Sequence, residues 1–422
     1  METRKVAIAC QGGGIHGAFT CGVLSAILQA KEDEVQGVLP EHAKRNFEIV
    51  GLSGTSAGAL NAFMVWYGLM AKGERPGSFA EARKAVNNLW DTFQVRTIGE
   101  TVLNTVAQQM YKLNEKGISV TPPRPAYFYD WLMSALGQWS VVEGLVAPKL
   151  DLREIRPEFY DFAALLRTCA PEFPVIEADL SRIAAKRIRP RVVLGSVEVL
   201  SGEFEAFDSW SNPDLPPRER RPISYEAVEA SGTLPELRRS QRIPGILNRD
   251  GNEGRYWDGL FSQNPPIREL VARTPREDRP DEIWVVRINP KRCDNEPESL
   301  AAIGDRRNEL AGNHSLNLEL RFLNGINQLL ARLRPLIEKH PEDPILSPIA
   351  NFIPIKTYMI TMSKEKNVLG VGSKMDRSPE FVTDMRQHGE ARAAAFLPLW
   401  LSDSQDLLEW PGDALALIDR GC

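Results

Sequence analysis

A serine in a glycine-flanked pentapeptide is the residue of this sequence best placed to act as a nucleophile. Residues 54–58 read Gly-Thr-Ser-Ala-Gly and match Gly-x-Ser-x-Gly, a pattern in which the serine stands at a sharp strand-to-helix turn and the glycines avoid side-chain clashes. With glycine and serine each at roughly 7% usage, about one chain in seven of this length holds such a match by chance. The motif alone therefore also fits a tight packing turn.

A second glycine-rich segment could hold a negative charge. Gly12, Gly13 and Gly14 stand between an apolar run and a helical pattern, where backbone N–H groups without partners bind anions. An acyl-transfer enzyme needs such donors for the oxyanion of its tetrahedral intermediate. The same loop could also cradle a nucleotide phosphate. A Walker loop is excluded because no Gly-Lys-Ser/Thr follows. A dinucleotide loop stays open, although the usual Gly-x-Gly-x-x-Gly spacing and an acidic partner after the second strand are missing.

A serine nucleophile needs a base, and the histidines of the chain are poorly placed to provide it. They are His16, His42, His314, His340 and His388. In a Gly-x-Ser-x-Gly hydrolase with a Ser-His-Asp triad, the histidine comes last, on a loop after a late strand. His314 and His388 fall in helical patterns and His340 in a proline-bounded linker, which favours surface or hydrogen-bonded roles. Asp258 is the better candidate, although an Asp-Gly step is by itself an ordinary turn signal.

Taken in order, these segments resemble the patatin-like phospholipase family. The resemblance is carried by residues 12–17, by the pentapeptide at 54–58, and by Asp258 and Gly259 followed by Asn264 and Pro265. Residues 230–235 also resemble the Ala-Ser-x-x-x-Pro segment that precedes the aspartate in that family. The similarity covers roughly residues 5–270, except for 72–190. The tail from about 295 to 422 resembles the extra C-terminal region of some bacterial members.

The resemblance implies a Ser-Asp dyad in which Ser56 is the nucleophile and Asp258 the general base. It also implies an oxyanion hole made by the backbone N–H groups of Gly13 and Gly14, with Gly12 as a further candidate. Supporting roles in the elbow and the loops fall to Gly54, Gly58, His16, Gly17 and Gly259.

His16 departs from the family pattern, which usually has Arg or Lys at this position. A cation there is thought to order the glycine loop or to meet phosphate. Histidine, with an ordinary pKa near 6.5, would be only partly charged at neutral pH. This weakens the expectation that the protein prefers anionic phospholipid.

The function that the resemblance implies is a serine acyl hydrolase that cleaves carboxylic esters of lipids, of the phospholipase A or lipase type, through an acyl-enzyme. It requires neither a metal nor a cofactor. Two alternatives stay open: a lipid transacylase that uses the same dyad, and a non-catalytic nucleotide-binding or scaffolding module. The sequence does not set the lipid class, the position of cleavage or the oligomeric state.

The elements that must position these residues follow an α/β pattern. Apolar runs at 6–10 and 48–53 are each followed by a glycine turn and an apolar helical pattern, at 18–30 and 59–70. Two such strand–helix units predict a largely parallel sheet. Further strands are expected at 191–200, 203–207, 283–288 and 355–360. The resemblance implies that the sheet belongs to a three-layer α/β/α fold.

We expect an acyl hydrolase domain at 1–295, in which 72–190 form a helical cap insertion, and a mostly helical C-terminal region at 296–422 packed on it. The cap is rich in aromatic residues and is interrupted by prolines at 122–125. Residues 298–334 predict one long helix or a helical pair, whose apolar face is interpreted as a core face rather than a lipid-surface or oligomer-forming face. Ser378 as a cap and Pro379 at the first helical position predict a helix through about Leu397.

Composition sets broad limits on the class of protein. The 422 residues are 43% hydrophobic and 25% charged, the usual balance of a globular protein. The net charge of -5 argues against a nucleic-acid binder. Five scattered cysteines indicate neither a disulfide framework nor a zinc site and fit a reducing, cytoplasmic setting. No secretion signal is recognised, and the apolar stretch at 57–71 is too short to span a bilayer, so any membrane contact is expected to be peripheral.

Overall fold

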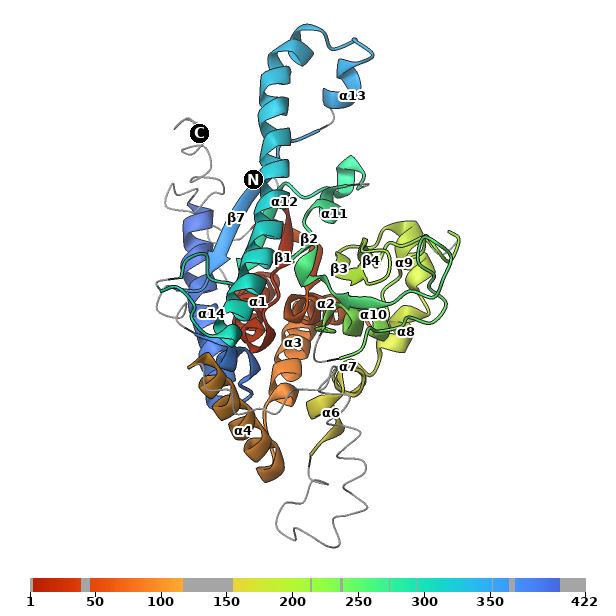
Figure 1. The fold of residues 1–422 in the computed structure, drawn as a ribbon. Coiled ribbons are helices and arrows are strands. Elements are labelled where there is room, and N and C mark those ends of the chain that lie inside the picture. Colours follow the sequence, from red (N-terminus) through yellow and green to blue (C-terminus); the bar gives the residue numbers. More distant parts are fainter. Residues whose placement is uncertain are drawn as a thin grey trace, which may run out of the picture.

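The computed structural model is built around a seven-stranded sheet with helices on both faces (Figure 1). It describes residues 3–38, 46–116, 155–212, 215–235, 238–272, 274–293, 295–350, 352–363 and 369–402. The strands are β1 (Arg4–Cys10), β2 (Phe47–Thr55), β3 (Arg191–Glu198), β4 (Phe204–Asp208), β5 (Tyr256–Asp258), β6 (Glu282–Arg287) and β7 (Lys356–Thr361). Their order is β4-β3-β2-β1-β6-β7, with β5 paired to β3. Only the β3–β4 and β3–β5 pairs are antiparallel among these strands, which confirms the mostly parallel α/β/α fold.

The helices of the first part of the chain surround the N-terminal strands. They are α1 (Gly17–Val35), α2 (Ala57–Leu69), α3 (Phe79–Phe93), α4 (Ile98–Glu115), α6 (Pro157–Tyr160), α7 (Phe162–Cys169), α8 (Phe173–Glu177), α9 (Leu180–Lys186), α10 (Tyr225–Ser231) and α11 (Arg268–Val271). Those of the C-terminal region are α12 (Leu300–Lys339), α13 (Leu346–Ala350) and α14 (Pro379–Leu401). Short 3₁₀ turns are η1 (Gly14–His16), η4 (Gly259–Phe261), η5 (Arg276–Asp278) and η7 (Val371–Met375).

Two apolar cores lie on opposite faces of the sheet. Successive residues of a strand point to opposite faces, so Val6 and Ile8 of β1 join one core and Ala7 and Ala9 join the other. Side chains of α1, α2, α3 and α14 fill the first core, and α12 contributes to the second. Strands covered on both faces need apolar residues at nearly every position, which explains the continuous apolar runs in the sequence.

The C-terminal region is joined to the first part of the chain through backbone contacts. β7 extends the sheet beyond β6, and α14 lies beside α1 (Figure 1). Two glycines allow this close approach: a Cβ on Gly22 would lie 1.9 Å from the carbonyl oxygen of Arg386, and a Cβ on Gly389 would lie 2.0 Å from that of Phe19. Both contacts involve backbone atoms, so a larger residue at either position would push the two helices apart.

All six strands expected from the apolar runs are present, and the expected helix at 298–334 is the single 40-residue α12. The burial of Leu316, Leu320 and Leu323 confirms the interpretation of α12 as a core-packing helix, although Leu310 is half exposed. The expected cap at Ser378 is wrong in one respect. Ser378 does precede α14, but its side chain accepts no capping hydrogen bond.

The helices and strands assigned among the described residues of 72–190 are all helices, from α3 to α9, joined by turns and irregular segments. The prolines at 122–125 and five aromatic residues of the expected cap lie outside the described residues; these five are Tyr127, Phe128, Tyr129, Trp131 and Trp139. The domain boundary at 295 stays a prediction. No helix in the described part of the chain combines the length and the apolar character needed to cross a bilayer.

Candidate active site

Ser56 stands at the turn between β2 and α2, with φ 58° and ψ -130°. This backbone conformation is strained for a residue with a side chain and costs about 1–3 kcal/mol. The flanking glycines are required by contact between backbones: a Cβ on Gly54 would lie 2.2 Å from the carbonyl oxygen of Gly58, and a Cβ on Gly58 would lie 2.0 Å from that of Cys10. The pentapeptide therefore forms the elbow that its pattern predicts.

The N–H of Ser56 is held by Ser231, at the end of α10. It donates to the Ser231 carbonyl oxygen at 3.0 Å and lies 3.1 Å from Ser231 Oγ. Ser231 Oγ in turn donates to the carbonyl oxygen of Gly195, at 2.5 Å. This network links the elbow to β3 and fixes the orientation of the turn. Ser231 belongs to the segment 230–235 that resembles the family, but no local pattern indicates its contact with Ser56.

The first glycine loop packs directly against the elbow. A Cβ on Gly12 would lie 2.6 Å from Ser56 Cβ. The Gly12 N–H donates to Asn264 Oδ1 at 2.7 Å, so it already has an acceptor within the protein. This corrects the expectation that Gly12 adds a donor to the oxyanion hole. Gly13 and Gly14 stay candidates, because they precede and open η1, where N–H groups have no acceptor within the turn.

Polar side chains from later in the chain fix the conformation of this loop. Gln11 Oε1 accepts the N–H groups of Ile288 and Asn289, at 3.1 and 2.9 Å. Asn289 Nδ2 donates to the carbonyl oxygen of Gly12 at 3.2 Å. The loop is thus tied to the end of β6 by buried hydrogen bonds. No local sequence pattern at Gln11 or Asn289 indicates this role, because the role depends on contacts between residues that lie at least 277 positions apart in the sequence.

Asn264→Ala tests the importance of this fixed loop. The substitution leaves the buried Gly12 N–H without its acceptor, which destabilises the fold by about 1–3 kcal/mol and loosens the donors beside Ser56. We expect kcat for a soluble ester to fall by roughly 10- to 100-fold, with a smaller change in KM, because oxyanion donors act mainly in the transition state. Asn264→Asp keeps an acceptor oxygen and serves as the matched control. Wild-type kcat in a folded Ala variant would contradict the role.

Asp258 ends β5 and is fully buried beside Ser56. Its N–H donates to the Thr233 carbonyl oxygen at 2.8 Å, and its Oδ1 accepts the Leu260 N–H at 2.9 Å. Burial raises the pKa of Asp258 to about 7, and a hydrogen-bonding interaction with the Ser56 side chain opposes this rise. Oδ2 nevertheless has no hydrogen bond of standard geometry. Catalytic hydrogen bonds are often long in unliganded enzymes and shorten when substrate binds.

Gly17 and Gly259, for which supporting roles are expected, both occupy crowded positions. A Cβ on Gly17 would lie 2.6 Å from the Cβ of Ala57, the residue that follows Ser56. A Cβ on Gly259 would lie 2.8 Å from the backbone of Gly195 in β3. Side chains at either position would therefore displace the elbow or the aspartate.

His16 is buried and uncharged, contrary to the expectation of partial charge. Burial, reinforced by the positive charge of Lys374, lowers the pKa of His16 to about 3. Its Nε2 lies 2.8 Å from Ser373 Oγ of η7, so the ring connects the glycine loop to the C-terminal region. None of the described histidines lines the cavity at Ser56, and His42 lies outside the described residues.

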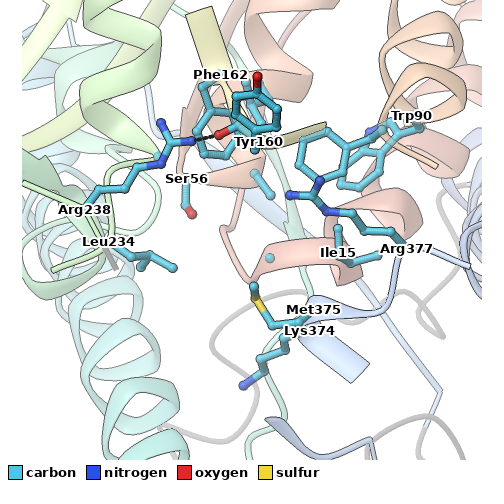
Figure 2. Close-up of a pocket in the computed structure, with 15 residues that line it drawn as sticks. Ile15, Ser56, Trp90, Tyr160, Phe162, Leu234, Arg238, Lys374, Met375 and Arg377 are labelled. Carbon is cyan, nitrogen blue, oxygen red and sulfur yellow. Dashed lines mark hydrogen bonds between the residues drawn. The ribbon is translucent and has the colours of Figure 1, made fainter. Parts of the chain in front are cut away.

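Ser56 lies in the wall of a cavity of about 90 Å³ (Figure 2). Most of its walls are apolar or aromatic, and part of one wall comes from η7 and the residues after it. The lining residues are Gly14, Ile15, Ser56, Ala57, Leu60, Trp90, Phe93, Tyr160, Phe162, Gly232, Leu234, Arg238, Lys374, Met375 and Arg377.

The η7 wall touches the glycine loop directly. A Cβ on Gly14 would lie 2.5 Å from the carbonyl oxygen of Lys374. Lys374 Nζ is paired with Asp305 and Glu309 of α12, at 2.6 and 3.0 Å. Three segments far apart in the sequence thus meet beside the candidate oxyanion donors. No motif in the sequence points to residues 371–377.

Comparison with known proteins identifies the kind of chain to which this site belongs. The model of the family described as "Patatin-like phospholipase" matches residues 8–271. Among solved structures, VipD from Legionella pneumophila is similar over 94% of this chain and 67% of its own, with 14% sequence identity and a TM-score of 0.38. No curated protein matches.

Proposed function

We propose that this chain, which belongs to the patatin-like phospholipase family, is a serine acyl hydrolase that cleaves carboxylic esters of lipids through a Ser56–Asp258 dyad. One observation carries the proposal. Ser56 stands on a strained elbow in the wall of an apolar cavity, and the buried Asp258 interacts with its side chain and has a pKa of about 7. A serine needs a neighbouring base to become a nucleophile, and Asp258 can accept its proton.

In the first half of the reaction, Ser56 Oγ attacks the ester carbonyl carbon while its proton moves to Asp258 Oδ2. A base whose pKa lies close to neutral pH suits this transfer, because it is partly ionised and still basic enough to bind a proton. Negative charge develops on the carbonyl oxygen, and the N–H groups of Gly13 and Gly14 stabilise it. Collapse of the intermediate breaks the ester bond, and Asp258 returns the proton to the leaving alcohol.

In the second half, water replaces the alcohol. Asp258 accepts a proton from water, the resulting hydroxide adds to the acyl carbon, and the proton returns to Ser56 as the fatty acid leaves. The acyl chain is held by the apolar walls, to which Ile15, Leu60 and Trp90 contribute. Dispersion and the removal of apolar surface from water supply its binding energy. This arrangement supports a phospholipase A or lipase type of reaction.

Covalent labelling tests the proposal on the wild-type protein. A fluorophosphonate probe should react at Ser56 alone, as located by peptide mass spectrometry, and p-nitrophenyl butyrate should be hydrolysed without a metal ion. Ser201→Ala, in the exposed turn after β3, should label like the wild type and controls for nonspecific reaction. Absence of labelling together with absence of ester turnover would instead support a non-catalytic module. Transfer of the acyl group to an added alcohol in place of water would support a transacylase.

A further inference from the structure

The 3₁₀ turn η7 contacts both ends of η1, the turn that begins with the last glycine of the loop. A Cβ on Gly14, the first residue of η1, would lie 2.5 Å from the carbonyl oxygen of Lys374. His16 is the last residue of η1, and its Nε2 lies 2.8 Å from Ser373 Oγ. The N–H groups proposed as oxyanion donors, those of Gly13 and Gly14, stand at the start of the same turn. Movement of η7 would therefore change the direction in which they point.

The contact between His16 and Ser373 has a defined direction. Ser373 Oγ donates to the carbonyl oxygen of Gly370 at 2.6 Å, and a hydroxyl group has only one hydrogen to donate. In its contact with His16 the hydroxyl must therefore accept, so Nε2 of the ring carries the proton. Because His16 is buried and its pKa is lowered to about 3, the ring is neutral at neutral pH and has a single N–H group. That group binds η7.

The turn η7 is itself held by helices on two sides. Lys374 Nζ is paired with Asp305 and Glu309 of α12, at 2.6 and 3.0 Å, and the Gly372 N–H donates to Glu115 Oε1 of α4 at 3.0 Å. The side chains of Lys374, Asp305 and Glu309 are at most 14% exposed, so salt screens this cluster less than it screens a surface pair. These contacts give η7 a fixed position from which it can act on the glycine loop.

We propose that Ser373 is a positioning residue of the reaction, which acts through His16 to hold Gly13 and Gly14 in the conformation that stabilises the oxyanion. Donors that are already in place cost no reorganisation when negative charge develops. Glycines have little conformational preference of their own, so contacts from outside the loop must set its geometry. Ser373 lies beyond the residues 8–271 that match the family. The inference rests on the proposed function, since it concerns the oxyanion of the Ser56 reaction.

Kinetics of Ser373 variants test this role. Ser373→Ala leaves the buried His16 N–H without its acceptor, and kcat for p-nitrophenyl butyrate should fall by about tenfold, less than the loss of a whole oxyanion donor. KM should stay within about twofold, because the donors act mainly in the transition state. Ser373→Thr keeps a hydroxyl group and should retain most of kcat. Ser378→Ala is the matched control, since the Ser378 side chain accepts no capping hydrogen bond.

Two further measurements separate positioning from folding. Each kcat is divided by the fraction of protein that the fluorophosphonate probe labels, so that inactive protein does not count. Histidine ¹⁵N NMR then reports the hydrogen bond without any turnover. His16 should be neutral and protonated at Nε2 at both pH 5 and pH 8, because its pKa is about 3, and the His16→Gln variant identifies its resonances. Ser373→Ala should shift these resonances, whereas Ser378→Ala should not.

The outcomes separate this inference from the proposed function. Wild-type kcat in Ser373→Ala, or a proton on Nδ1 of His16 in the wild type, would overturn the positioning role and leave the hydrolase intact. A loss of kcat that disappears when the rate is divided by the labelled fraction would assign Ser373 a purely structural role and overturn the inference as well. Failure of the wild type to cleave any ester would contradict the proposed function and this inference together.

Discussion

Replacing Ser56 with Ala should abolish lipid ester turnover while the protein stays folded. Removing the nucleophile of a serine hydrolase lowers kcat by at least about 10⁴-fold, because binding and oxyanion stabilisation alone give little rate. The measurement is the initial rate of fatty acid release from phosphatidylglycerol micelles, and circular dichroism confirms the fold. Because the substitution removes only the hydroxyl group and keeps the Cβ of the turn, the free energy of unfolding of the Ala variant should stay within about 1 kcal/mol of the wild type.

Ser56→Gly provides the matched control and tests the strain at the elbow separately. Glycine adopts the backbone angles of Ser56 (φ 58°, ψ -130°) without the steric cost that Ala and Ser share. The Gly variant should be as inactive as the Ala variant but more stable by about 1–3 kcal/mol in urea unfolding. Residual turnover near the wild-type rate in either folded variant would disprove Ser56 as the nucleophile.

Asp258→Asn should lower kcat by about 10⁴-fold, because an amide has the shape of the carboxyl group but cannot accept the Ser56 proton. It should also change the pH dependence of stability. The folded pKa of about 7 lies above the ordinary value of 3.8 for this carboxyl group, so between these two pH values the folded state keeps a proton that the unfolded state has released. The contribution of Asp258 to the free energy of unfolding of the wild type is therefore fully present below pH 3.8. Roughly 4 kcal/mol of it is lost as the pH rises through 7.

Urea unfolding at pH 5 and pH 8 measures this effect. The contributions of other titrating groups to the pH dependence of stability cancel when the wild type and the variant are compared. Relative to the wild type, Asp258→Asn should gain stability at pH 8 and gain less at pH 5. Asp250→Asn, in an exposed turn, should show neither change. Wild-type kcat/KM should rise with pH through about 7, since the ionised carboxylate is the base. A flat pH profile, or a stability difference independent of pH, would disprove Asp258 as a buried base.

The strands and the elbow could be predicted from the sequence because their signals are local. β1 and β2 are continuous apolar runs. The backbone contacts that require glycine at positions 54 and 58 involve only the five residues of the motif and one neighbouring strand. β5 could not be predicted in this way. It has three residues and exists because β3 offers it a partner, so the burial that raises the pKa of Asp258 follows from tertiary structure.

Contacts between distant segments account for the rest of the site. Asn264 was visible as part of a motif, but its hydrogen bond to Gly12 joins residues 252 positions apart. The charge at His16 was misjudged because its pKa depends on burial and on Lys374, neither of which leaves a pattern near residue 16. The arginines of the cavity wall were missed for the same reason: Arg238 and Arg377 have ordinary sequence neighbours and become neighbours of Ser56 only in the fold.

The contact between α1 and α14 at Gly22 and Gly389 bears on how substrate preference can evolve in this protein. It anchors residues 371–377 beside the cavity, although this stretch lies beyond the residues 8–271 that match the family. Part of the cavity wall beside Ser56 is thus supplied from outside the family match, by Lys374, Met375 and Arg377. Substitutions in this later stretch can reshape the cavity while Ser56 and the glycine turns are preserved, so homologues with identical motifs can differ in the shape of the pocket.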